Sequence, residues 1–388
     1  MKNNLILDSF LKKISNNNCK RNDVKSVILL YEDPDAYIGD SFIRLLHLKP
    51  VRGFYQNARI SLNYLKKDYT FIYSALLQNN PYLDELHQMQ WAEIPFESYD
   101  VILCLTFDER ELLEHLAMRY GQQISDGSFT PCVFSIFTKG AFRLSNIVPF
   151  IFPKHEELFA YSAQIMEQTG REIYITDEER HWGNTWLKDR GLQADEDLFI
   201  VVDAASQRHK LLDIAVYFEF LKYLLHKPKS KVLIFDENDI GKQDFYREFL
   251  EDELAARLIF SKENSLRLNI CLMSTSQVKM VFGPCTGPMH CASGVYNNFV
   301  KNGMPREQVP LIIVYTGKNK LTTASFWWST SPLVKCLLLR TTNKNVEMVL
   351  LTDLSGEERT RMDNQADCSR YTTEMLIDFV DRNLKLKA

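Results

Sequence analysis

The chain has 388 residues, of which 45% are hydrophobic and 25% charged, and its net charge at pH 7 is −4. This length allows two domains with separate cores, and the composition is that of an ordinary globular protein. Because no basic excess is present to neutralise phosphates, the charge excludes nucleic acid as the main partner.

Cysteine usage and hydropathy indicate the compartment. The eight cysteines form no CxxC pair, which predicts reduced thiols in a cytoplasmic protein. No apolar segment reaches the ~20 residues of a membrane-spanning helix, and the polar start predicts no cleavable signal.

Apolar runs alternate with helical patterns in the first part of the chain. This alternation predicts βαβ units and a parallel sheet. The predicted elements are a strand at 24–31, a helix starting near Gly39-Asp40, a turn at 54–57, an amphipathic helix at 59–65, and strands at 69–73, 99–105 and 132–137.

A second alternating series follows a helical region. The predicted elements are a helix at 155–170, a helix within 176–197, strands at 198–202, 231–235, 258–260, 278–282 and 310–315, and a C-terminal helix at 371–386. The sequence therefore predicts two α/β halves, 1–153 and 198–370, joined by a helical linker at 154–197 and followed by a terminal helix at 371–388.

The most informative motif begins where the strand at 278–282 ends. A Gly-Pro turn precedes Thr286-Gly287-x-x-His290, which opens a predicted helix. The unpaired N–H groups and the dipole of a helix N-terminus favour phosphate, and the Thr286 hydroxyl and His290 imidazole would add donors. The alternative is a small-residue turn that only connects strand to helix.

Two further loops follow strands, where ligands bind in open parallel sheets. Gly39, Asp40 and Ser41 follow the first strand, and Asp40 could cap a helix, act as a general base, or do both. Arg208, His209 and Lys210 follow the strand at 198–202 and offer cations to a diphosphate, unless they are only solvated loop residues.

Several other classes of site lack their motifs. The sequence contains no HExxH, no Gly-x-Ser-x-Gly, no GxxxxGK[ST] and no GxGxxG after the first strand. These absences disfavour a catalytic metal cluster, an acyl-transfer hydrolase, a Walker-type ATPase and a dinucleotide fingerprint. The aromatic run 326–328 is expected to pack as cleft or core surface, with a ligand role as the alternative.

The order of these motifs resembles the heptosyltransferase-like glycosyltransferases of family nine, over most of the chain. The resemblance implies a GT-B fold, in which two Rossmann-like domains face each other across a cleft. The matching segments are Gly39-Asp40, Asn80-Pro81-Tyr82-Leu83-Asp84-Glu85, Tyr99 to Leu103, the linker at 155–170, Thr286-Gly287-Pro288-Met289-His290 and Tyr315-Thr316-Gly317.

The resemblance also implies an activity, which is metal-independent transfer of a sugar from a nucleotide-diphosphate sugar to a glycan or glycolipid hydroxyl, without a cofactor. Asp40 would be the base, in an acceptor loop with Gly39 and Ser41. The predicted donor-binding residues are Ser206, Arg208, Lys210, Cys285, Thr286, Gly287 and His290. The implied setting is surface-glycan or lipopolysaccharide biosynthesis in the cytoplasm, with peripheral contact at the inner membrane face left open.

Two positions depart from the family pattern. Cys285 stands where the family usually has Asp, and the loop around Lys210 lacks the usual Trp-Pro. These departures keep two alternatives open: a catalytically silent GT-B-like binding or regulatory protein, and a sugar-nucleotide epimerase.

Overall fold

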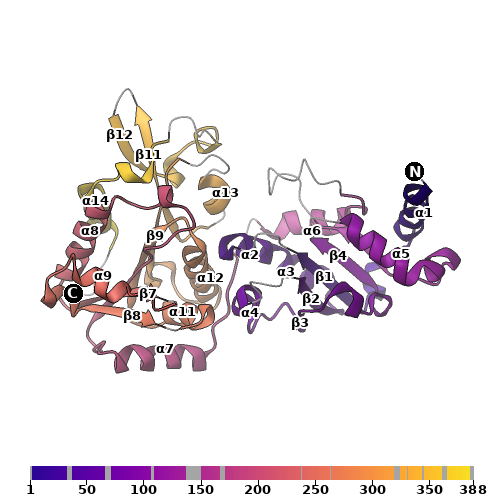
Figure 1. Cartoon of the computed structure of the whole chain (residues 1–388), viewed down its shortest axis with the longest axis horizontal. Coiled ribbons are helices and arrows are strands. Elements are labelled where there is room, and N and C mark those ends of the chain that lie inside the picture. Colours follow the sequence, from indigo (N-terminus) through magenta and orange to yellow (C-terminus); the bar gives the residue numbers. More distant parts are fainter. Residues whose placement is uncertain are drawn as a thin grey trace. The chain divides into compact units, whose positions relative to one another are not determined.

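The computed structural model of the chain describes two compact units, each built on one β-sheet (Figure 1). The first unit comprises Met1–Tyr37, Ile43–Ser74 and Asn80–Thr169, and the second comprises Ile38–Phe42, Ala75–Asn79 and Gly170–Ala388. The described residues are 2–32, 37–65, 71–105, 109–136, 150–166, 171–236, 238–262, 264–318, 324–329, 331–342, 345–360 and 365–384.

The sheet of the first unit is parallel throughout, with the strand order β3-β2-β1-β4-β5. Its first strand is therefore central, and the chain winds outward from it in both directions. The elements of this part of the chain are α1 (Lys2–Ser15), β1 (Ser26–Glu32), α2 (Ile38–Arg44), α3 (Leu48–Phe54), β2 (Arg59–Leu65), α4 (Phe71–Leu77), β3 (Glu85–His87), β4 (Val101–Leu105), α5 (Glu109–Asp126), β5 (Cys132–Ser135) and α6 (Glu156–Met166).

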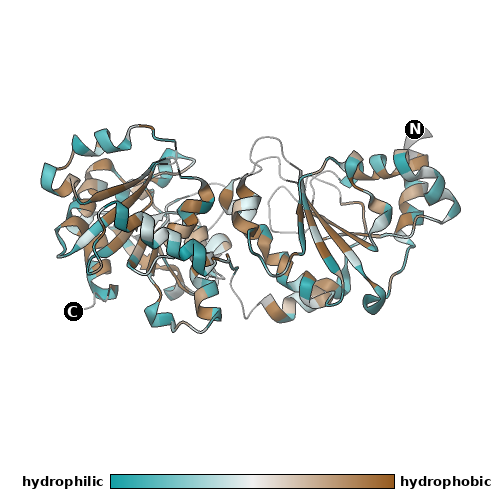
Figure 2. Ribbon diagram, turned by 90° about the horizontal axis from the view of Figure 1, so that it is seen from below, coloured by the Kyte–Doolittle hydropathy of each residue, from teal (hydrophilic) through white to brown (hydrophobic). Residues whose placement is uncertain are grey.

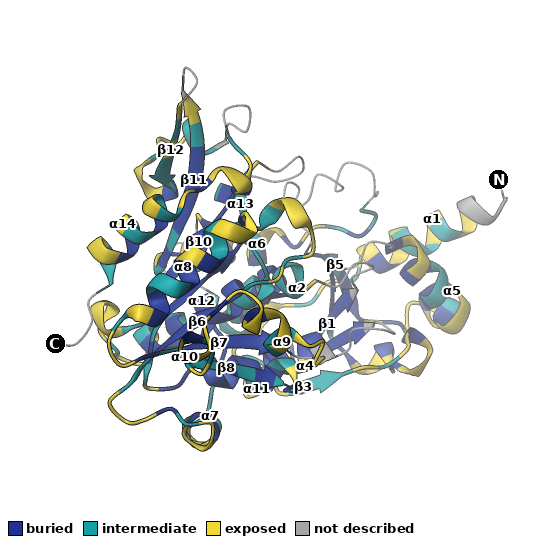
Figure 3. Cartoon of the chain, turned by 60° about the vertical axis from the view of Figure 1, so that its left-hand side comes forward, coloured by how far each residue is buried: buried dark blue, intermediate teal, exposed yellow. Residues whose placement is uncertain are grey.

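The core of the first unit lies between this sheet and helices α1 and α5. Ile14 of α1 and Leu116 of α5 pack with Ile28, Ile102 and Val133 of the strands. Every residue of β4 is buried, as expected for a parallel strand with a neighbour on each side and covered faces. The strands are accordingly the most hydrophobic segments in Figure 2 and among the most buried in Figure 3.

The sheet of the second unit has the order β12-β11-β10-β9-β6-β7-β8, and only its β11–β12 pair is antiparallel. Without β12, this is the 3-2-1-4-5-6 order of nucleotide-binding Rossmann folds. The elements are α7 (Asp177–Asp189), β6 (Asp197–Val201), α8 (Ile214–His226), β7 (Ser230–Asp236), α9 (Lys242–Arg247), α10 (Asp252–Ala255), β8 (Leu258–Lys262), α11 (Leu266–Met273), β9 (Val278–Pro284), α12 (Gly287–Lys301), β10 (Leu311–Tyr315), α13 (Ala324–Trp328), β11 (Val334–Thr342), β12 (Asn345–Leu350) and α14 (Thr373–Asn383).

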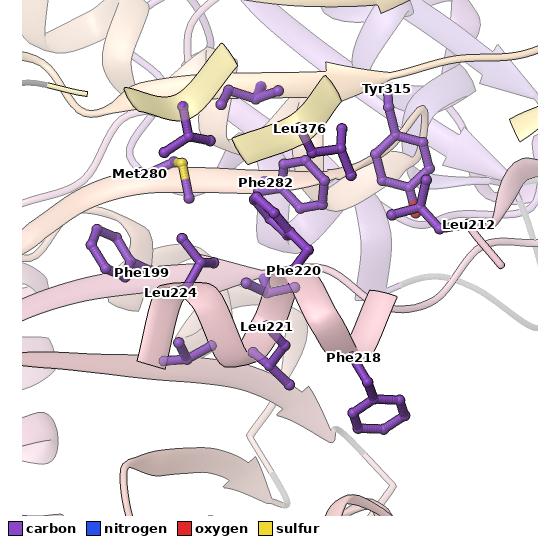
Figure 4. Close-up of a cluster of buried hydrophobic side chains, with 14 of the residues drawn as sticks. Phe199, Leu212, Phe218, Phe220, Leu221, Leu224, Met280, Phe282, Tyr315 and Leu376 are labelled. Carbon is purple, nitrogen blue, oxygen red and sulfur yellow. The ribbon is translucent and has the colours of Figure 1, made fainter. Parts of the chain in front are cut away.

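The core on one face of this sheet is rich in aromatic residues (Figure 4). Phe220 of α8 contacts Phe282 of β9, with ring centroids 4.5 Å apart, and Phe282 contacts Tyr315 of β10 at 5.3 Å. Leu376 of α14 joins the same cluster. On the other side of the sheet, α12 packs on β9 and β10. With helices on both faces, the rigid sheet can fix the loops at its edges.

Most of the predicted strands and helices are confirmed. The strands at 24–31, 99–105 and 132–137 correspond to β1, β4 and β5, and those of the second series to β6–β10. The predicted helices near 39–40, in 176–197 and at 371–386 correspond to α2, α7 and α14, and the helix at 155–170 to α6, although 167–170 lie outside the described residues.

Two neighbouring predictions are wrong. Residues 59–65 form strand β2, not a helix, and 71–73 begin helix α4, not a strand; residues 69–70 lie outside the described residues. Ser61 and Asn63 resemble the polar side of a helix, but both are buried. They hydrogen-bond to Glu85 and to the carbonyl of Met89, so the polar residues of β2 are satisfied inside the sheet.

Candidate functional site

The sheet order of the second unit brings two of the predicted loops together. β6 pairs with β9, and Val201 lies opposite Phe282 in their register. The winding direction reverses between these two strands, which is the position where open α/β sheets bind ligands. The loops that start at Asp203 and at Cys285 therefore leave the sheet from adjacent strands.

The turn after β9 requires small residues. A side chain at Gly283 would place its Cβ 2.7 Å from the Cβ of Val202, and one at Gly287 would clash with Ile38. Thr286 is the N-cap of α12, a helix of 15 residues with proline in its first turn. The first N–H groups of such a helix have no acceptor within the helix.

Polar atoms of this first turn are buried without a partner. Among the residues that the structure describes, the Thr286 Oγ1 and His290 Nδ1 atoms make no hydrogen bond, and Thr286 does not cap the helix with its hydroxyl. Buried polar groups are normally satisfied, so unpaired ones at a helix N-terminus are candidates for contact with a ligand.

His290 is held as a neutral imidazole. It is 2% exposed and stacks on Trp328, with ring centroids 4.0 Å apart and planes 6° from parallel. Burial lowers the pKa of His290 to about 3, helped by the charges of Arg171 and Lys210. Phe42 of α2 contacts the His290 ring. A Cβ at position 39 would lie 3.2 Å from the Cδ2 atom of His290. The glycine at position 39 thus admits the imidazole.

Cys285 is a neutral thiol at the end of β9. Its sulfur accepts a hydrogen bond from Trp328 Nε1 at 3.2 Å. Burial raises the pKa of Cys285 to about 11, Lys210 opposes this shift and Asp40 adds to it. The charges of Lys210 and Asp40 therefore both act on position 285.

The loop after β6 carries the predicted cations. Ser206 and Arg208 are exposed and Lys210 is half-buried. Arg208–Lys210 form a 3-10 turn that packs against a second such turn, Cys368–Arg370. The charge of Lys210 acts on the α12 turn, since it lowers the pKa of both Cys285 and His290.

Asp203 anchors the start of this loop, and the sequence alone did not single it out. Its Oδ1 atom is 2.7 Å from Lys242 Nζ, and its Oδ2 atom accepts from the Tyr246 hydroxyl at 2.9 Å. Lys242 also donates to the carbonyl of Phe235, at the end of β7. These contacts link the ends of β6 and β7 where the loop begins.

Arg171 is a second residue missed from the sequence, because it lies in a segment that was expected only to link the two halves. Asn297 Nδ2 donates to its carbonyl at 2.9 Å, and Ile173 N donates to the carbonyl of Gly294 at 3.0 Å. Burial lowers the pKa of Arg171 to about 10, and its charge acts on His290. Arg171 and Lys210 are therefore two cations whose charges act on His290.

The predicted acceptor loop lies in the first turn of α2. Because this helix begins at Ile38, Asp40 is inside the turn and not at the capping position. Ser41 is fully buried, with its hydroxyl unpaired among the described residues. Ile38–Phe42 belong to the second unit and contact α12, so Asp40 lies near Cys285.

The described ranges hold neither a cluster of metal ligands nor a helix that could span a membrane. In that part of the chain, no three His, Cys, Asp or Glu side chains are grouped as metal ligands. None of its helices combines the length and hydropathy needed to cross a bilayer.

Comparison with known proteins defines the class of fold. The structure matches E. coli ADP-heptose lipopolysaccharide heptosyltransferase II, with a TM-score of 0.59 and 14% identity over 92% of this chain and 98% of that one. It also matches a family 9 glycosyl transferase from Veillonella parvula, with a TM-score of 0.59 and 14% identity over 94% and 98%. No protein-family model and no curated protein matches the sequence.

These matches confirm the predicted fold class. The chain has the GT-B arrangement of two Rossmann-like α/β units, and its fold is that of heptosyltransferases and family 9 glycosyltransferases. At 14% identity the likeness concerns the fold. The chemistry must be argued from the residues of the site.

Proposed function

We propose that this protein is a glycosyltransferase that moves a sugar from a nucleotide-diphosphate donor to a hydroxyl of a glycan or lipid-linked acceptor. The observation that carries the proposal is the buried Thr286 hydroxyl at the N-terminus of α12, which has no partner among the described residues and follows the strand next to the cation-bearing loop after β6. A diphosphate supplies acceptor oxygens for these donors and negative charge for the cations.

In this proposal the protein itself stabilises the leaving group, without a metal. Lys210, Arg208 and the first turn of α12 face the diphosphate, and Arg171 adds charge behind His290. Donors fixed before the reaction stabilise the charge that develops on the departing diphosphate, without having to reorient. Ser206 and Gly287 would contribute a hydroxyl and a backbone N–H.

Asp40 is the proposed base. It would take the proton from the acceptor hydroxyl as the new glycosidic bond forms, a contribution of about 10²–10⁴-fold in rate. It lies in the first turn of α2, and its charge acts on Cys285 at the proposed donor site. Gly39 and Ser41 would shape the acceptor loop around it.

We further propose that 154–197 joins an acceptor domain (1–153) to a donor domain (198–370), followed by the terminal segment 371–388. α6 falls in the first compact unit and α7 in the second, which is compatible with a connecting role.

A nucleotide-binding protein without turnover is the second candidate, and Cys285 favours it. Because its pKa is raised to about 11, the Cys285 thiol stays neutral at pH 7 and cannot supply the negative charge of the Asp that the family usually has at this position.

If Cys285 instead adapts an active enzyme to another donor, Cys285→Asp should change the ranking of donors and leave the melting temperature nearly unchanged. A large fall in melting temperature with an unchanged ranking would show that Cys285 only packs under the turn.

Two measurements separate these functions. Titration with ADP, UDP, GDP and CDP, each beside its nucleoside, detects a diphosphate site. An acceptor-free assay of donor-sugar hydrolysis then separates the enzyme from the binding protein. Diphosphate binding with slow sugar release supports the enzyme, whereas tight binding of intact donors with no release supports the binding protein.

A further inference from the structure

Two cysteines of the first unit lie side by side, although they are far apart in the sequence. Cys19 is in the loop after α1, and Cys132 is the first residue of β5. Asn17 fastens this loop, since its Nδ2 atom donates to the carbonyls of Phe129 at 2.9 Å and Pro131 at 2.8 Å. Both cysteines are free thiols, and their side chains interact with each other.

The two thiols differ in access and in acidity. Cys19 is half-exposed, whereas Cys132 is 1% exposed. The contact with Cys132 lowers the pKa of Cys19, against the opposing effects of burial and of Asp100 and Glu157. The same contact raises the pKa of Cys132. Cys19 is therefore the more acidic and the more accessible of the two thiols, and Cys132 is its buried neighbour.

This arrangement has the features of a reversible oxidation site. Oxidant-sensitive cysteines are accessible, have a lowered pKa and lie next to a second thiol that can displace the oxidant. Cys285 offers a contrast within the same chain: it is also partly exposed, but burial raises its pKa to about 11.

We propose that Cys19 and Cys132 form a redox modification site, at which a small-molecule disulfide such as glutathione disulfide oxidises the pair to an intramolecular disulfide. The Cys19 thiolate attacks one sulfur of the oxidant, forming a mixed disulfide and expelling one thiolate. The Cys132 sulfur then attacks the Cys19 sulfur, and the second small thiol leaves with the Cys132 proton. Two electrons pass from the protein thiols to the oxidant.

The bond would join the end of α1 to the start of β5. A cross-link between such distant positions closes a long loop in the unfolded chain, so it lowers the entropy of the unfolded state and raises the melting temperature. Asn17 is a positioning residue here, because it sets the loop against β5 before any bond forms.

The test uses the full chain, reduced and then exposed to glutathione disulfide at neutral pH without denaturant. After alkylation of the remaining thiols, non-reducing digestion and mass spectrometry should identify a Cys19–Cys132 cross-linked peptide. Thiol titration should show a loss of two thiols, and a reducing agent should restore both. The oxidised protein should melt at a higher temperature than the reduced one.

Four variants make the outcome decisive. Cys132→Ser should stop at a mixed disulfide on Cys19, and Cys19→Ser should give neither product. The matched control Cys285→Ser should retain the cross-link. Wild-type protein that accumulates only the mixed disulfide on Cys19, or that cross-links only in denaturant, would overturn the proposal. Asn17→Ala should slow cross-linking without changing mixed-disulfide formation in the Cys132→Ser background.

Discussion

Helices α5 and α12 occupy equivalent places in the two units but begin in opposite ways. Each follows the strand that pairs with the first strand of its sheet: β4 beside β1, and β9 beside β6. The first residue of α5 is Glu109, whose Oε2 atom accepts the N–H groups of Ile151 at 2.8 Å and Phe152 at 2.9 Å. The start of α5 is thus occupied by a carboxylate of the chain itself.

The segment that opens α12, 283–290, contains no acidic residue of its own, although the charge of Asp40 acts on Cys285. Cys285, Thr286 and His290 are neutral, and the polar atoms of Thr286 and His290 stay unpaired in the described part of the chain. Lys210 and Arg171 act on the same turn. Two helices in the same topology therefore differ in the charges at their first turns, and this difference supports the proposed diphosphate site in the second unit.

The largest effect is expected from Asp40, the only carboxylate proposed to act in the reaction. Asp40→Asn should reduce transfer by ~10²–10⁴-fold, because the amide cannot accept the acceptor proton. Donor binding and melting temperature should hardly change, and they serve as controls in the same preparation. Near-normal transfer by this variant, with donor and acceptor in hand, would show that Asp40 is not the base.

Asp203 tests whether the cation-bearing loop depends on its anchor. Asp203→Asn leaves the largely buried Lys242 ammonium without its anion, and should lower the free energy of unfolding by about 3 kcal/mol. The double variant Asp203→Asn/Lys242→Met should lose less, because no charge is left unpaired. Urea unfolding of the wild type, the single variant and the double variant measures these differences. If both variants lose the same free energy of unfolding, the ion pair does not stabilise the loop.

Lys210 tests the charge at α12 more directly. Lys210→Gln should weaken nucleotide-diphosphate binding by about 1.5–3 kcal/mol, the range for a lost charged hydrogen bond. Binding of the matching nucleoside should not change. Arg247→Gln is a suitable control, since this arginine lies on the exposed surface of α9. Equal losses for nucleotide and nucleoside would mean that Lys210 supports the fold.

The smallest effect is expected from Glu109, the carboxyl group at the start of α5. Burial raises the pKa of Glu109, so the folded protein holds this proton to higher pH than the unfolded chain does. The stability that Glu109 contributes is complete below its unfolded pKa, about 4.3, and is lost as pH rises through the raised folded value. Thermal melts of Glu109→Gln as a function of pH should lack this decline. A parallel pH dependence in both proteins would contradict this assignment.

Much of the second unit could be predicted from the sequence, because its strands are long apolar runs bounded by turns. The motif at Thr286–His290 follows one such run, so its place at a helix N-terminus was predictable. In the first unit, β2 was misread because Ser61 and Asn63 are polar yet buried, with partners that come from β3 and the segment after it.

The missed site residues have a common cause. Asp203 matters through Lys242 and Tyr246, which lie on α9, and Arg171 through contacts with α12. Such partnerships depend on tertiary structure, and no local spacing encodes them. The strands β11 and β12 were not predicted either; they extend the second sheet beyond the parallel strands that the alternation indicates.

Calorimetric titration of the full chain with nucleoside diphosphates tests the central claim most directly, with inorganic diphosphate as competitor and Thr286→Val as the matched variant. The account predicts that at least one nucleoside diphosphate binds more tightly than its nucleoside, that inorganic diphosphate competes with it, and that Thr286→Val weakens only the phosphate-bearing ligand. A diphosphate site at the start of α12 would be contradicted if nucleoside and nucleoside diphosphate bound with equal affinity. Neither inorganic diphosphate nor Thr286→Val would then change that affinity.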